Sequence, residues 1–253
     1  MDNWSDLCLA EMYQSISEDD YFYAVWKRRA VLDETKVALA LEQHGLWQRA
    51  QEVFLSVMNR ASSGNLPSKT GSSQPLPATV PYSEVCLWEE HWINCAKRLS
   101  QWELLNEYAK TTHNGFNELL LESSWKVSDW TAMKEALGKG IIPESYQLKI
   151  YQCYVAIHEG KPSDFETLHN QAIQYALKHH QTLPEIPSVA HIPLLQSFQK
   201  IVELKESAQI LKDLNQNKQN CIPDLKNTLN TWRSRLPATW DDILAWSDIL
   251  LWR

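Results

Sequence analysis

The segment GNLPSKT, from Gly64 to Thr70, holds residue types that bind a nucleotide phosphate. A phosphate-binding loop needs two glycines separated by four residues and followed directly by Lys, because its backbone amides wrap the phosphate. Here the second glycine is absent, Lys69 comes one residue early, and no alternating strand pattern precedes the segment. The sequence therefore predicts no nucleotide site in this segment.

The histidines and cysteines also lack the spacing of a catalytic or metal site. His91, in WEEHW, has no second His four residues away, and His179 and His180 are adjacent, so they point to different faces of a helix. Five separated cysteines without a C-x-x-C pair are typical of a reducing compartment. Cys95 and Cys153 fall at helical core positions, where Cys acts as a small hydrophobic residue. We expect no catalytic residue, no metal and no cofactor, and hence no enzyme.

Composition and net charge limit the kinds of molecule that the chain could bind and the folds that it could adopt. The net charge is −7, which argues against nucleic-acid binding and against binding to an anionic membrane surface. No run of 18 apolar residues could cross a membrane. With only 7 glycines, the chain is a poor candidate for a β-sandwich or a dinucleotide-binding fold. Other proteins remain as partners, with no direct nucleic-acid contact and no small-molecule substrate.

Helical periodicity dominates the sequence. In residues 35–60, Val37, Leu41 and His44 recur at helical spacing, and the pattern resumes after Gly45 with Leu46 and four later apolar residues. Gly45 is suited to end one helix and begin a tight turn. Two helices joined in this way form an αα-hairpin. No segment shows a strand pattern, so the chain is predicted to be all-α.

The hairpin recurs around three tryptophans that open the second helix. Each Trp is followed three residues later by an apolar residue and is preceded seven residues earlier by a small one. The first copy fits the second helix of a tetratricopeptide repeat (TPR), and the other two are more degenerate. We interpret the copies as TPR-like αα-hairpins stacked in a curved solenoid, the alternative being chance recurrence in Trp-rich helices. The tryptophans could also line a peptide groove, but most should be core. The predicted repeat core is Trp47, Ala50, Phe54, Trp102, Leu105, Trp130 and Met133.

Two polar stretches interrupt the helical pattern. Residues 61–81 are rich in Ser, Gly and Pro and are predicted to be a flexible loop, and 212–222 are predicted to be a polar linker. Further helices are predicted at 143–158, 163–180, 193–213, 223–236 and 241–252.

Several long blocks resemble the FAT region of the TRRAP family (transformation/transcription-domain-associated protein). They are LALEQHGLWQRAQE, LWEEHWINCAKRLSQWELLNEYA, LLLESSWKVSDWTAMKEAL, HIPLLQSFQKIVELKESAQI, TWRSRLP and WSDILLWR. The resemblance runs from Leu7 to Arg253 and weakens at 61–81 and 212–222. It implies that residues 1–253 are a single FAT-type helical-repeat segment of a much larger protein.

The resemblance also implies a function. Members of this family resemble phosphatidylinositol-3-kinase-related kinases, but their kinase-like domain is a pseudokinase, and the FAT region contributes no catalytic residue. The family docks transcriptional activators in nuclear histone acetyltransferase complexes such as SAGA. Partners would be activators, acetyltransferase-complex subunits and the parent's own pseudokinase domain, in the nucleus. Two alternatives remain open: the FAT scaffold of an active kinase, and a free-standing TPR-type peptide-binding adaptor.

Overall fold

The computed structural model describes residues 3–16, 18–62, 80–112, 116–139, 142–215 and 221–240, together with Trp246, Ser247 and Ile249. These residues are helices and their connections, with no strand among them, which confirms the all-α class. The chain divides into two compact units, residues 1–105 and 106–253, and the division falls inside one helix. That both units form one FAT-type segment over 1–253 stays a prediction.

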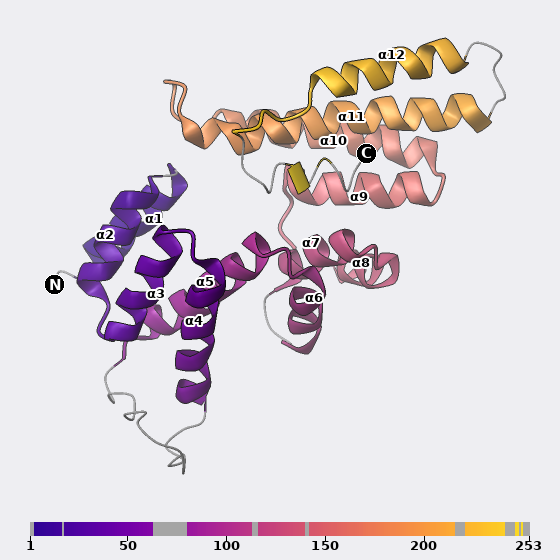
Figure 1. Cartoon of the computed structure of the whole chain (residues 1–253). Helices are drawn as coiled ribbons and strands as arrows, with labels where there is room; N and C mark the ends of the chain where they lie inside the picture. The colour runs from indigo at the N-terminus through magenta and orange to yellow at the C-terminus, as the bar shows by residue number, and fades with distance from the viewer. Residues whose placement is uncertain are drawn as a thin grey trace. The chain divides into compact units, whose positions relative to one another are not determined.

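The first unit stacks five helices in chain order and includes the start of a sixth. They are α1 (Asn3–Ser15), α2 (Asp19–Arg29), α3 (Asp33–Gln43), α4 (Trp47–Ser62), α5 (Tyr82–Arg98) and the first turn of α6 (Trp102–Thr111). From α1 to α5, each helix packs against the next in sequence (Figure 1). The core is centred on Trp88, Phe54 and Leu39, whose side chains are almost completely buried.

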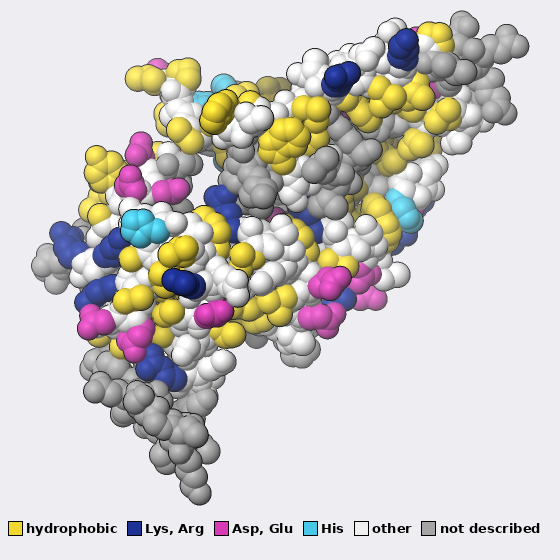
Figure 2. Space-filling model, in the orientation of Figure 1, with side chains coloured by type: hydrophobic (Ala, Val, Ile, Leu, Met, Phe, Trp, Pro, Cys, Tyr) yellow, Lys and Arg dark blue, Asp and Glu magenta, His cyan; other side chains and the backbone are white. Residues whose placement is uncertain are grey.

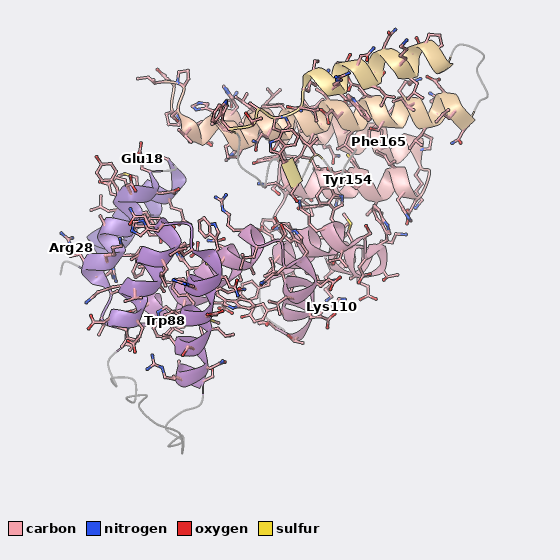
Figure 3. All side chains as sticks on the ribbon, in the orientation of Figure 1. Glu18, Arg28, Trp88, Lys110, Tyr154 and Phe165 are labelled. Carbon is pink, nitrogen blue, oxygen red and sulfur yellow. The ribbon has the colours of Figure 1, made fainter. Side chains whose placement is uncertain are left out.

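The second unit repeats this arrangement of consecutive helices. After the end of α6 it contains α7 (Asn117–Val127), α8 (Trp130–Gly138), α9 (Tyr146–His158), α10 (Pro162–His180), the short 3-10 helix η1 (Val189–His191), α11 (Ile192–Asn215) and α12 (Cys221–Ser234). From α7 to α12 consecutive α-helices pack together, and α11 also reaches α9. Trp125 of α7 stacks on Tyr154 of α9, which is labelled in Figure 3, with 5.0 Å between ring centroids, so aromatic contacts also join alternate helices.

The same left-handed turn closes four of the helices. Gly45, Ser100, Ser128 and Gly160 have φ of +73°, +56°, +62° and +66°. At each, the turn residue donates its N–H three residues back, and the next residue donates five residues back, as Gly45 N does to Glu42 O and Leu46 N to Leu41 O. This Schellman pattern satisfies the last carbonyls of the helix. The next helix begins two residues after each turn residue.

Some predicted boundaries were wrong. Helix α9 begins at Tyr146 and not at residue 143, because the Ser145 side chain accepts the Leu148 N–H and caps the helix there. Residues 212–215 and 221–222 of the predicted linker 212–222 belong to α11, which continues to Asn215, and to α12, which begins at Cys221, while 216–220 lie outside the described residues. Residues 63–79 of the predicted loop, and most of the predicted helix 241–252, lie outside the described residues.

Candidate interaction site

The seven residues predicted as repeat core lie in two kinds of environment. Five have buried side chains: Ala50, Phe54, Trp102, Leu105 and Met133. Trp47 and Trp130 are half-buried at the first position of α4 and α8. These two rings therefore lie at the edges of their hairpins. The contribution of each residue to stability stays a prediction.

The two half-buried tryptophans contact the end of the helix that follows their own. The Arg98 guanidinium, in the last turn of α5, lies 5.4 Å from the ring centroid of Trp47 on α4. The His158 ring, at the end of α9, stacks on Trp130 of α8 with 4.2 Å between centroids. Arg98 and His158 each stand two residues before a left-handed turn residue. A nitrogen-rich side chain over the tryptophan thus recurs at the junction between one helix pair and the next.

Helix α8 has a strong N-cap beside Trp130. The Asp129 carboxylate accepts the Ala132 N–H at 3.1 Å and the Thr131 hydroxyl at 2.6 Å, and Lys110 of α6 pairs with it at 3.1 Å. These hydrogen bonds, with the nearby ammonium, lower the pKa of Asp129 to about 2. The cap therefore stays ionised well into acid.

A buried carboxylate joins α5 to the start of α3. Glu84 is 1 % exposed, and its two oxygens accept the Val31 N–H at 2.9 Å, the Leu32 N–H at 3.2 Å and the Thr35 hydroxyl at 2.7 Å. The indole N–H of Trp88 donates to the same Thr35 oxygen at 2.8 Å. Glu84 thus caps the N-terminal end of a helix from another helix, which satisfies amides that would otherwise lose their water.

A second buried pair lies further along the same two helices. His91 Nδ1 of α5 lies 2.5 Å from Glu42 Oε2 of α3, and both side chains are 4 % exposed. The His91 ring also stacks on Phe22 of α2 at 5.4 Å. Burial, and next the charge of Glu42, raise the pKa of Tyr23. Through these contacts the His91–Glu42 pair connects helices α2, α3 and α5.

These pairs explain why the predicted core face of α3 was wrong. Val37 is 52 % exposed, and His44 is also exposed. The buried face instead carries Thr35, Ala38, Leu39 and Glu42. Two of these four are polar, so an apolar period could not identify them.

A cleft of about 690 Å³ lies in the second unit, where the end of α9, the start of α10 and the second half of α11 meet. Ala156 and Phe165 are buried at its floor, Ala208 is half-buried, and Leu211 is 45 % exposed. Phe165 extends from α10, as Figure 3 shows. A pocket of this volume can hold a small ligand or a few side chains of a partner. Sequence periodicity did not indicate it.

His169 lines the cleft as a neutral donor. Its Nε2 lies 3.0 Å from the Ile201 carbonyl oxygen, so Nε2 carries the proton and Nδ1 is an acceptor. Burial lowers the pKa of His169, and the nearby Lys205 charge lowers it further. Glu159, at the end of α9, also lines the cleft. It pairs with Lys134 at 2.8 Å and with Lys161 at 2.7 Å, and these partners lower the pKa of Glu159 to about 2.

The two cysteines predicted at core positions, Cys95 and Cys153, are buried. Burial raises the pKa of Cys153 to about 12 and raises that of Cys95 further, so neither thiol is a ready nucleophile. Among the described residues, no three His, Cys, Asp or Glu side chains converge as metal ligands. No helix in that part of the chain is long and apolar enough to span a membrane. Lys69 of the phosphate-loop resemblance lies outside the described residues.

Comparison with known families identifies the helical stack. The FAT domain family matches residues 117–253, just over half of the chain. The chain belongs to the FAT-domain family. The matched FAT residues include α7 to α12, so they contain the cleft, Trp130 and the Asp129 cap.

Similarity to whole-protein relatives covers both units. The human "Transformation/transcription domain-associated protein" is 39 % identical over 255 residues, covering 97 % of this chain. The Saccharomyces cerevisiae "SAGA complex/NuA4 acetyltransferase complex subunit TRA1" is 36 % identical over 258 residues, and the Drosophila melanogaster "Transcription-associated protein 1" is 36 % identical over 252. The chain spans about 6 % of the length of these relatives. The resemblance to the TRRAP family is thus confirmed.

Proposed function

We propose that the chain is a non-catalytic scaffold segment of a TRRAP-like subunit of nuclear histone acetyltransferase complexes. It would support the docking of transcriptional activators and complex subunits, and would contact the parent's own pseudokinase domain. The observation that carries the proposal is 36 % identity, over 97 % of the chain, to a yeast protein named as a subunit of the SAGA and NuA4 acetyltransferase complexes.

The interior fits a scaffold role. The buried groups Glu84, Glu42 and His91 hold helices together. Glu84 accepts two backbone N–H groups and the Thr35 hydroxyl, and Glu42 pairs with His91 Nδ1. Buried polar networks of this kind fix one arrangement of packed helices. On the face in Figure 2, acidic and basic side chains are interspersed on the first unit, and apolar side chains gather along α11 and α12 of the second. Exposed apolar side chains on a helical stack are suited to contacts with other proteins.

Two other functions remain alternatives. The FAT scaffold of an active phosphatidylinositol-3-kinase-related kinase would share the fold but adjoin a catalytic domain. A free-standing TPR-type adaptor would bind a peptide in the cytosol. The names of the relatives favour the acetyltransferase role over both, because they place those proteins in transcription.

Affinity purification of the full-length parent from nuclear extract tests the proposal. Quantitative mass spectrometry should recover histone acetyltransferase subunits, with no kinase activity in the eluate. A parent carrying Trp102→Asp and Trp130→Asp together should lose most of these subunits or fail to accumulate, since Trp102 is buried and Trp130 lies at a helix junction. Lys226→Glu, at an exposed position on α12, is the matched control and should change neither.

Two results would refute the proposal. Chaperones and cytosolic peptide clients, without any acetyltransferase subunit, would favour the adaptor. Kinase activity in the eluate with signalling substrates would favour the active kinase.

A further inference from the structure

Two lysines stand at one edge of the cleft in the second unit. Lys205 and Lys212 are both exposed on α11 and both line the cleft. Seven residues are two helical turns, so the lysines lie on the same face about 10 Å apart along the axis. Ala208 and Leu211 lie between them in sequence and add apolar surface to the same wall.

The charges of the cleft are not balanced internally. Glu159 is already occupied by Lys134 and Lys161. Neither Lys205 nor Lys212 pairs with a carboxylate among the residues that the structure describes. Glu166 is the remaining acidic side chain of the lining, and α10 carries it. The α11 edge is therefore positive, in a chain whose net charge is −7.

We propose that this cleft binds a short acidic amphipathic helix of a partner protein. A helix with acidic residues at i and i+7 repeats the spacing of the two lysines, because seven residues again make two turns. Apolar residues at i+3 and i+4 of that helix point to the same side and would enter between Phe165 and Leu211. Glu166, on the α10 side of the cleft, repels the acidic edge of the bound helix toward α11 and so fixes the orientation of that helix.

Other occupants fit less well. A nucleic acid needs a basic face that follows its backbone, whereas two lysines flank an apolar floor here. A small phosphate would leave the apolar wall of Ala156, Phe165 and Leu211 without a contact.

A designed peptide tests the proposal on the complete 253-residue chain. The probe is a fluorescein-labelled helical peptide with Glu at i and i+7 and Leu at i+3 and i+4, titrated by fluorescence anisotropy. We expect a Kd on the order of tens of micromolar, because such a small contact buries much less than a standard interface. Replacing both Leu residues of the peptide with Ser should abolish measurable binding, and raising salt should weaken it.

Charge reversal makes the test specific. Lys205→Glu with Lys212→Glu should weaken binding at least tenfold, and a peptide with Lys in place of both Glu should then bind this variant about as well as the original pair. Lys226→Glu, outside the cleft on α12, should leave binding within about twofold. Melting curves check that each variant is folded.

Three outcomes would overturn the proposal. The first is no binding by the wild-type chain at about 1 mM peptide, a concentration at which even a very weak complex forms. The second is loss of binding without rescue by the Lys peptide, and the third is displacement of the peptide by inorganic phosphate at matched ionic strength. The proposal rests on the docking role proposed above, and the two can fail separately. Absence of acetyltransferase subunits from the wild-type parent refutes that role, whereas failure of the peptide to bind refutes the cleft alone.

Discussion

Replacing Glu84 with Gln should destabilise the first unit through a countable loss of hydrogen bonds. In the wild type, one carboxylate oxygen accepts from Leu32 N and Thr35 Oγ1, and the other accepts from Val31 N. A glutamine can keep the first oxygen, but it then places an NH2 group against the Val31 N–H. The part-buried Val31 N–H and one amide N–H of the glutamine are left without acceptors beside a position where the wild-type side chain is 1 % exposed.

The magnitude follows from these two losses. A buried donor without a partner costs about 1–3 kcal/mol, so the two losses in Glu84→Gln should together cost about 2–6 kcal/mol of unfolding free energy. Glu84→Ala leaves all three donors unpaired and a cavity as well, and should cost more. Glu103→Gln is the matched control, because Glu103 is exposed on α6, and it should cost less than about 0.5 kcal/mol.

Urea unfolding followed by tryptophan fluorescence measures both changes. A double-mutant cycle with Thr35→Val should show a coupling energy of about 1 kcal/mol or more, because Thr35 joins Glu84 to the Trp88 indole. If Glu84→Gln unfolds within 0.5 kcal/mol of the wild type, on the order of an ordinary surface change, the capping of α3 from α5 contributes nothing and the reasoning fails.

Three further predictions rest on other parts of the fold. Ser100→Gly and Ser128→Gly should each stabilise the chain by about 0.5–1 kcal/mol in urea unfolding, because both serines hold a positive φ that glycine adopts without strain; a loss of stability would contradict the turn geometry. Trp102→Ala should cost about 3–5 kcal/mol and Trp47→Ala clearly less, since Trp102 is 9 % exposed and Trp47 only half-buried; equal costs would be the contrary result. The folded-state pKa of His169 lies below the unfolded value of about 6.5, so on acidification the unfolded chain binds this proton before the folded chain does. The free energy of unfolding should therefore fall as the pH drops below about 6.5. His169→Gln should remove that part of the pH dependence, and an unchanged profile would show that another group causes it.

The helix-turn register could be read from the sequence where the residue types are diagnostic. Gly45 has the positive φ that its position predicted, and the tryptophans two residues after the turns begin α4, α6 and α8. The turns at Ser100 and Ser128 could not be read in the same way. Serine rarely adopts a positive φ, so only the helices on either side force that conformation.

The polar core and the cleft were beyond sequence reasoning for a different reason. Glu42 and Glu84 are buried because His91 and the start of α3 supply partners from distant parts of the chain. Periodicity treats each helix alone and assigns such carboxylates to solvent. The cleft likewise depends on where three helices meet, and the spacing of Lys205 and Lys212 has meaning only beside Phe165 of α10.

Cross-linking mass spectrometry of the native, full-length parent tests the scaffold role most directly. An amine-reactive cross-linker can report exposed lysines of this segment, such as Lys205 and Lys212. The account predicts cross-links from these lysines to histone acetyltransferase-complex subunits and to the parent's kinase-like domain. Intact complexes in which these lysines cross-link to no other subunit and to no other part of the parent would contradict it.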